Sequence, residues 1–222
     1  MASAESVSSL DQKRSLRRAM NDRRAQLTVA DRQQAAGRAA ERLLALKEVD
    51  EVARRAGCVA GFAAVRAEID PAAALDEVRR RGGRVAYPRV ADAERPRLRF
   101  HVAESAELRA GRFGIPEPPA SNEEVGLGQI DLLIVPGVAF DAEGRRLGFG
   151  GGYYDELLGT RPSGAAAAGP VVVGLAYDFQ IVDACPAEPH DQMIDGVVTD
   201  ARVIRGGTRN DGRGCDGGAG TP

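Results

Sequence analysis

The chain has 222 residues, and its 30 lysines and arginines against 32 aspartates and glutamates give a formal net charge of −2. That length suits one sizeable domain, and the balanced charge argues against a general nucleic-acid or membrane-surface binder, because such proteins carry a strong field of one sign. Nowhere do 18 apolar residues occur together, so no membrane span is expected.

Two helices are predicted in the first fifth of the chain. Ser9 and Gln12 have the spacing of a capping box before a basic helix that runs to about Leu27. Thr28 can cap a second helix, in which alanines and leucines repeat at helical spacing as far as Leu46.

Strands and helices alternate through the rest of the chain. Short apolar runs predict strands, and a helix that begins at Asp70-Pro71 and ends near Gly82 separates the first two. The expected strands are 58–63, 85–87, 98–102, 132–135, 171–175 and 197–198. This alternation predicts a three-layer α/β fold, with a mostly parallel sheet and helices on both faces. We expect one domain over residues 9–205, a disordered segment over 1–8 and a disordered tail over 206–222.

The cysteines Cys58, Cys185 and Cys215 are widely spaced and form no Cys-x-x-Cys pair. Reduced thiols are therefore expected rather than a zinc or redox site. A signal-peptide pattern is not found either, so the expected location is the cytoplasm.

The most informative segment follows the apolar run 132–135, which stops at Pro136-Gly137. Ligand sites in open α/β sheets lie beyond such strand ends. Arginines at 145 and 146 then precede a glycine cluster, where backbone N–H groups can approach an anion, and a helix starts after it. Tyr153 stands where a Walker loop or a dinucleotide fingerprint needs another residue, so both are excluded. The glycines alone fit a flexible turn equally well, but Arg146, the tyrosine pair and Asp155 make a phosphate cradle the more specific interpretation.

This segment resembles the signature of the 5-formyltetrahydrofolate cyclo-ligase family, also called 5,10-methenyltetrahydrofolate synthetases. The matching segments are 13–17, 113–118, 136–141, 144–155, 190–191 and 195–199, and the resemblance spans about residues 13 to 204. It implies a fold related to sugar-phosphate isomerases and coenzyme A transferases. It also implies ATP-driven cyclisation of 5-formyltetrahydrofolate to 5,10-methenyltetrahydrofolate through phosphorylation of the formyl oxygen, with release of ADP and phosphate. ATP and Mg²⁺ are the implied cofactors, the folate is the partner, and we expect a monomer without nucleic-acid or membrane partners.

The resemblance implies a role for each part of the site. Catalytic roles fall on Lys13, Arg146 and Asp155, and the metal ligands would be Asp155 and Asp191. The nucleotide would contact Lys13, Arg14, Ser15, Leu16 and Arg17 in the first helix, and Arg146, Leu147, Gly148, Phe149, Gly150, Gly151, Gly152, Tyr153 and Tyr154 in the loop. The folate would contact Ala63, Glu68, Phe149, Gly150, Gly151, Gly152 and Tyr153, with Tyr87-Pro88 and Phe113 as weaker candidates for the pocket wall.

Reasoning from the residues alone leaves alternatives for both sides of the site. Lys13 and Arg17 lie four residues apart, so both can reach one anion, and lysine is scarce because only Lys13 and Lys47 occur. A solvated basic face is the alternative, and it is the preferred interpretation for Arg14, Arg18, Arg23 and Arg24. A lone glutamate such as Glu68 more often is a solvated loop residue, whereas the resemblance favours a pterin contact.

One departure from the family pattern and two rival functions complete the predictions. Some members carry a lysine where this chain has Gly151, so phosphate neutralisation would rest on Lys13, Arg17 and Arg146. His101 and His190 are expected to be structural or supporting residues, since the reaction does not obviously need a histidine base. The rivals are a non-catalytic nucleotide- or anion-binding regulator of the same fold, and an enzyme like the sugar-phosphate isomerases or coenzyme A transferases.

Overall fold

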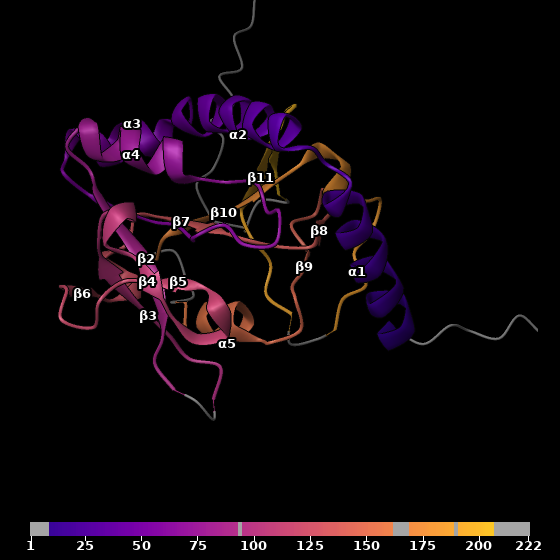
Figure 1. Ribbon diagram of the computed structural model, residues 1–222. Helices are drawn as coiled ribbons and strands as arrows, with labels where there is room; N and C mark the ends of the chain where they lie inside the picture. Colours follow the sequence, from indigo (N-terminus) through magenta and orange to yellow (C-terminus); the bar gives the residue numbers. More distant parts are fainter. Residues whose placement is uncertain (1–8, 93–94, 162–168, 189–190, 207–222) are drawn as a thin grey trace, which may run out of the picture.

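A mixed sheet runs through the molecule in the computed structural model, which describes residues 9–92, 95–161, 169–188 and 191–206 (Figure 1). Within these ranges the sheet has eight strands in the order β12-β11-β10-β7-β1-β2-β3-β6. Their bounds are β1 Cys58–Ala60, β2 Arg84–Val90, β3 Leu98–Val102, β6 Glu124–Val125, β7 Leu132–Val135, β10 Val171–Ala176, β11 Gly196–Thr199 and β12 Val203–Arg205.

The centre of this sheet is parallel and its edges are antiparallel. Strands β11, β10, β7, β1 and β2 pair in parallel, with Val59 opposite Leu132 and Leu133 opposite Val172. Strand β12 pairs antiparallel with β11, β3 with β2, and β6 with β3. The central strands β1, β7 and β11 are buried throughout, which agrees with a parallel sheet covered on both faces. The predicted mostly parallel sheet is confirmed, but β6 and β12 were not predicted.

Helices cover both faces, as the three-layer prediction requires. Helices α2 (Val29–Leu44), α3 (Lys47–Arg54) and α4 (Ala72–Arg80) lie together on one side, and α5 (Tyr153–Gly159) lies on the other (Figure 1). The first side buries one apolar cluster that includes Leu43, Val49 and Leu75, and the second buries another that includes Leu158 and Phe140.

The helix boundaries follow local hydrogen bonds. Thr28 caps α2 as predicted: its hydroxyl accepts from the Asp31 N–H at 3.1 Å, and the Asp31 carboxylate accepts from the Thr28 N–H at the same distance. The predicted continuation to Leu46 is wrong, because α2 ends at Leu44 and Leu46 is the residue that precedes α3. Ser9 lies inside the first helix rather than at its cap.

Helix α1 (Ser9–Ala25) lies beside a small hairpin of β8 (Ala139–Phe140) and β9 (Arg146–Leu147) (Figure 1). Leu16 and Met20 pack there against an apolar group formed by Ala139, Leu147 and Cys185. A second hairpin joins β4 (Arg109–Ala110) to β5 (Pro116–Glu117), and 3-10 turns occupy Ser105–Glu107, Arg112–Gly114, Leu127–Gln129 and Asp178–Gln180.

The thiols of Cys58 and Cys185 are free and buried, and burial raises their pKa to about 11 and about 12. His101 is also buried, and its Nδ1 lies 2.9 Å from the Asn122 carbonyl oxygen, as a structural histidine would. No described helix is both long and apolar enough to cross a membrane. Residues 1–8 and 207–222, with Cys215, and His190 lie outside the described ranges.

Candidate functional site

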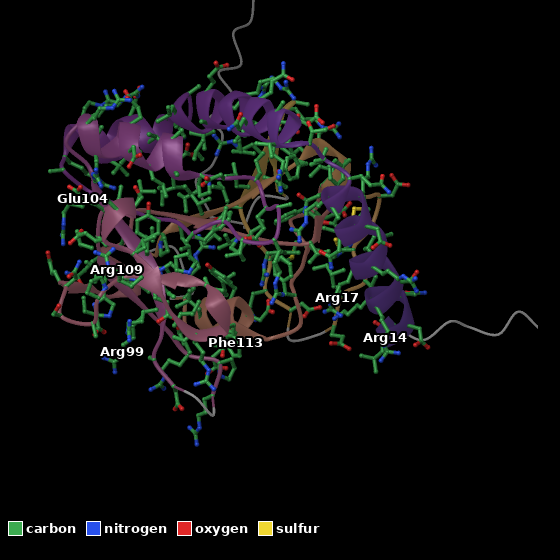
Figure 2. All side chains as sticks on the ribbon, in the orientation of Figure 1. Arg14, Arg17, Arg99, Glu104, Arg109 and Phe113 are labelled. Carbon is green, nitrogen blue, oxygen red and sulfur yellow. The ribbon has the colours of Figure 1, made fainter. Side chains whose placement is uncertain are left out.

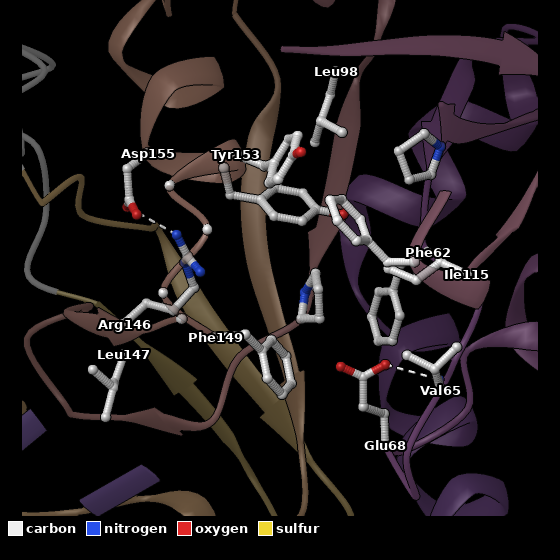
Figure 3. A pocket seen from close by; sticks show the side chains of 18 of the residues that line it. Phe62, Val65, Glu68, Leu98, Ile115, Arg146, Leu147, Phe149, Tyr153 and Asp155 are labelled. Carbon is white, nitrogen blue, oxygen red and sulfur yellow. Dashed lines mark hydrogen bonds and ion pairs between the residues drawn. The ribbon is translucent and has the colours of Figure 1, made fainter. Parts of the chain in front are cut away.

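A cavity of about 640 Å³ opens beyond the carboxyl ends of the central strands (Figure 3). Pro136, which follows β7, lies in its wall, as do Phe62 and Ala63, which follow β1. The position agrees with the rule that ligands bind outside the carboxyl ends of parallel strands. Arg146 and Asp155 lie on one side of the cavity and Glu68 on the other (Figure 3).

The glycine loop joins β9 to α5 and forms one wall of the cavity. Gly150 and Gly152 have φ angles of 98° and 71°, in the left-handed region that favours glycine. At Gly148 an added Cβ would lie 2.8 Å from the Arg146 guanidinium. The loop therefore needs glycine both for its backbone conformation and for its close approach to an arginine.

Arg146 is a buried cation held at the entrance to this loop. Its Nη2 donates to Asp155 Oδ1 at 2.8 Å, and its guanidinium lies 5.6 Å from the centre of the Tyr154 ring. Its Nε is buried and has no hydrogen-bond partner among the described residues. The Nε atom is covered by protein, but the residue lines the cavity, so its guanidinium charge can act on an anionic ligand there.

Helix α1 closes the cavity from the side of the hairpin. Lys13 is only 5% exposed, and its Nζ lies 2.9 Å from Asp191 Oδ2 and 3.0 Å from Glu188 Oε2. Burial opposes the ammonium charge, but the hydrogen bonds to the two carboxylates outweigh it and raise the pKa of Lys13. Arg17 Nε donates to the Gly148 carbonyl oxygen at 2.8 Å. The predicted anion-binding pair is therefore at the cavity, with Lys13 engaged by carboxylates.

The other predicted contacts on α1 do not lie in the cavity wall. The Arg14 side chain is 83% exposed and lies on the outer side of the helix (Figure 2), and Ser15 is exposed. Leu16 packs on the hairpin instead. The solvated-face interpretation is confirmed for Arg14 and Arg18, but it is wrong for Arg24, which is buried.

Glu68 marks the opposite side of the cavity (Figure 3). Its Oε2 accepts a hydrogen bond from the Val65 N–H at 2.9 Å. Burial raises the pKa of Glu68 to about 7, against the Val65 hydrogen bond and the charges of Arg24 and Arg66, which lower it. The interpretation of Glu68 as a freely solvated loop residue is wrong, because Glu68 is partly buried and lines the cavity.

Aromatic rings line the space between the two sides. The Tyr153 ring meets the Phe113 ring edge to face, with centroids 6.3 Å apart, and Phe62 and Phe149 lie in the same wall. Such rings suit a flat, partly apolar ligand. Tyr87 does not take part, because it is buried in the core, whereas its neighbour Pro88 reaches the cavity.

Several lining residues were missed by sequence reasoning. Glu188 contacts Lys13. Leu98, Ile115 and Glu117 come from segments that are distant in sequence from the glycine loop. Ile115 and Glu117 lie in the matching segment 113–118, and Glu188 precedes the 190–191 motif by two residues, so these three had a possible signal and Leu98 had none. The remaining predicted contacts, Leu147, Gly151 and Tyr154 among them, do line the cavity.

The predicted metal ligands Asp155 and Asp191 both line the cavity, and each faces a cation. Among the residues the structure describes, no group of three or more His, Cys, Asp or Glu side chains could hold a metal ion. Magnesium commonly takes only one or two protein carboxylates and completes its shell with phosphate oxygens and water. Its binding here therefore stays a prediction.

Comparison with known proteins places these features in a family. The sequence profile of the 5-formyltetrahydrofolate cyclo-ligase family matches residues 9–200. The 5-formyltetrahydrofolate cyclo-ligase of Escherichia coli (strain K12) is 33% identical over 192 residues, which cover 83% of this chain and 98% of that protein. The mitochondrial 5-formyltetrahydrofolate cyclo-ligase of Arabidopsis thaliana is 37% identical over 130 residues, 53% of this chain and 47% of that protein. The solved structure of Aquifex aeolicus 5,10-methenyltetrahydrofolate synthetase matches with a TM-score of 0.73 and 31% identity, covering 93% of this chain and 97% of that one.

Proposed function

The chain belongs to the 5-formyltetrahydrofolate cyclo-ligase family, and we propose that its cavity binds ATP beside 5-formyltetrahydrofolate and converts the folate to 5,10-methenyltetrahydrofolate, ADP and phosphate. One observation carries the proposal: a single cavity joins a cationic, glycine-lined side to an aromatic side with one carboxylate. The first side suits phosphate groups and the second suits a pterin ring.

The phosphate side fits a nucleotide for two structural reasons. Arg146 lines the cavity, so its guanidinium could form charge-assisted hydrogen bonds with phosphate oxygens. The glycines of the loop line the cavity and carry no side chains of their own, so their backbone N–H groups could come close to an anion. With Arg17 and Lys13 beside the loop, the charge of a triphosphate could be neutralised and positioned, which is most of what phosphoryl transfer needs.

Asp155 and Asp191 would hold a magnesium ion between these cations. When bound, the ion supplies positive charge to the phosphate oxygens. Each carboxylate would then give up part of its contact with Arg146 or Lys13, and each released cation could turn to the phosphates. Such an exchange leaves no charge without a partner, which matters for side chains that are largely buried.

The folate side fits the hydrogen-bond donors of a pterin. Glu68 uses one carboxylate oxygen for the Val65 N–H, and its other oxygen is available to the amino and ring N–H groups of the substrate. The rings of Phe62, Phe113 and Tyr153 would flank the pterin plane. This arrangement would direct the formyl group toward the glycine loop.

The proposed reaction needs activation because a formamide oxygen is a poor leaving group. The formyl oxygen attacks the γ-phosphorus of ATP, the bond to the bridging oxygen breaks, and ADP leaves. The second folate nitrogen then attacks the activated carbon and loses its proton. The carbon–oxygen bond breaks last, so phosphate departs with the former formyl oxygen and the methenyl bridge remains. Lys13, Arg17 and Arg146 would stabilise the negative charge that moves between these oxygens.

The test follows the near-ultraviolet absorbance of the methenyl product. Purified protein is mixed with 5-formyltetrahydrofolate, with ATP and magnesium added separately and together. We expect product only when both are present, and one ADP for each methenyl group. Folded protein that gives no product under any of these conditions would overturn the proposal, and product without ATP would overturn its phosphorylation step.

A further inference from the structure

Arg24, near the end of α1, is buried although the sequence around it predicts a solvated face. Arg24 is only 2% exposed, and its Nη2 donates a hydrogen bond to Asn21 Oδ1 at 2.8 Å. Its Nε is buried without a hydrogen-bond partner among the described residues, and burial lowers its pKa. A guanidinium in this state costs folding free energy unless other contacts offset it.

One of those contacts is Phe149 in the glycine loop. The Arg24 guanidinium lies 5.3 Å from the centre of the Phe149 ring, within the range of a cation–π interaction. Phe149 is 40% exposed and lines the cavity, and left-handed glycines follow it. Together with the bond from Arg17 to the Gly148 carbonyl, this contact fixes the loop against α1.

Arg24 also acts through its charge on Glu68, which lies on the opposite side of the cavity. The charges that act on Glu68 are those of Arg24 from α1 and Arg66 from its own loop, and Glu68 in turn acts on Tyr154 from α5. Arg66 is exposed, so solvent and salt screen it, whereas the buried charge of Arg24 is screened much less. Arg24 is therefore the cation expected to act most strongly on Glu68.

We propose that Arg24 is a positioning residue for the reaction: it supports Phe149 on the phosphate side of the cavity and holds a positive charge near Glu68 on the folate side. The role of Glu68 in folate binding is the part that rests on the proposed function. Arg24 thus couples the two halves of the site from a position that does not line the cavity itself.

The neighbouring arginine provides a matched control. Arg23 is exposed, and its guanidinium lies 4.4 Å from the Phe179 ring, beside a different depression of the surface. Arg23→Met and Arg24→Met therefore remove the same charge from the same turn of α1, but only the second removes it from Phe149 and Glu68.

The kinetic test measures kcat/KM for the folate against pH at saturating ATP. For Arg24→Met we expect the acidic limb of the profile to move to higher pH, because the carboxylate loses a nearby positive charge that lowers its pKa. The KM for the folate should rise by about tenfold and the KM for ATP by less, because the loss of binding falls mainly on the substrate that Glu68 is proposed to contact. Arg24→Lys should restore the pH profile, and Arg23→Met should match the unaltered protein. A pH profile unchanged in Arg24→Met would overturn the inference.

A second measurement does not depend on turnover. NMR follows the carboxyl-carbon signal of Glu68 against pH in the unliganded protein. The signal is assigned as the one that is missing from the spectrum of Glu68→Gln. Arg24→Met should shift this titration upward, whatever Glu68 does for the folate; an unchanged titration would contradict the proposed coupling. If instead Glu68→Gln leaves the KM for the folate unaltered, the pterin contact fails while the coupling stands. Should Arg24→Met not fold, Arg24→Gln takes its place with the same outcomes.

Discussion

The two sides of the cavity treat charge in opposite ways. On the phosphate side the charges come in pairs: Arg146 faces Asp155, and Lys13 faces Asp191 and Glu188 at 2.9 and 3.0 Å. On the folate side Glu68 accepts one backbone N–H and has cations only at longer range. Paired charges can exchange partners with a charged ligand, whereas burial raises the pKa of the single carboxylate of Glu68 to about 7.

This difference predicts what a substitution does on each side. Removing one member of a buried pair leaves the other without compensation, which harms both the empty protein and catalysis. Neutralising Glu68 instead removes a charge that burial disfavours, so binding should suffer while the empty protein gains stability. The predictions below test this contrast, beginning with the largest expected effect.

Asp155→Asn should lower turnover by about a thousandfold, or roughly 4 kcal/mol, because the carboxylate holds Arg146 and is the proposed magnesium ligand. Steady-state rates at increasing magnesium concentrations separate these two roles. If Asp155 binds the metal, the variant needs more magnesium for half-maximal rate. An unaltered magnesium requirement would leave only the positioning of Arg146, and normal turnover in folded protein would remove Asp155 from the site.

Lys13→Met should cost on the order of 2 to 4 kcal/mol of transition-state stabilisation, about thirtyfold to a thousandfold in rate. Because Lys13 is buried between two carboxylates, we also expect a loss of folding stability of about 1 to 2 kcal/mol. Thermal unfolding and steady-state kinetics on the same preparation measure both. Wild-type turnover and wild-type affinity for ATP would place the phosphate site in the glycine loop and Arg146 alone.

Glu68→Gln should raise the KM for the folate by about tenfold and leave the KM for ATP nearly unaltered, since the residue faces the aromatic side of the cavity. Separate titrations of the two substrates measure this split. Equal effects on both KM values would contradict the pterin role.

The same variant should be more stable than the unaltered protein at high pH. In the folded protein burial raises the pKa of Glu68 from 4.5 to about 7, so folding stability is lost as the pH rises from 4.5 through about 7. Glutamine removes that loss. Without ligands, Glu68→Gln should melt about 2 to 4 °C higher at pH 8, the shift expected for about 1 kcal/mol in a domain of this size. Melting curves at pH 4.5 should coincide; a constant difference at all pH values would point to packing instead.

Arg14→Met should have the smallest effect, well under 1 kcal/mol in stability and in catalysis, because the Arg14 side chain is 83% exposed. It lies next to Lys13 on the same helix and is therefore the control for that variant. A loss of ATP affinity in Arg14→Met would show that a nucleotide reaches beyond the cavity wall.

The fold was predictable where apolar runs are long and unambiguous. The runs at 132–135 and 171–175 correspond to β7 and β10 in the parallel centre of the sheet. Strands β6 and β12 are two and three residues long and partly exposed, so they have no apolar run to find. Helix α3 was not predicted. Leu46 continues the apolar spacing of α2, so the second helix was expected to run to it, but Leu46 has an extended backbone and precedes α3 instead.

The site was predictable where a motif lies in one stretch of chain, as the glycine loop and Arg146 do. Contacts made by tertiary packing were not, and Arg24 is the clearest case. The helical period that places Lys13 and Arg17 on one face brings position 24 almost to the same direction, eleven residues from Lys13. That spacing was the signal for Arg24, but the string of arginines around it gave the appearance of a solvated surface.

The placement of α1 also has a consequence for the order in which the enzyme is made. Lys13 bonds to a residue 178 positions later, and Arg17 to one 131 positions later, so the helix leaves the ribosome long before its partners exist. Contacts between such distant segments form late, because the intervening chain must first be ordered. The sheet can therefore assemble before the cavity closes, and in refolding the recovery of helix and strand signals should precede the recovery of activity. A cut between α1 and α2 would separate Lys13 and Arg17, the cations of α1 that line the cavity, from the sheet and the glycine loop.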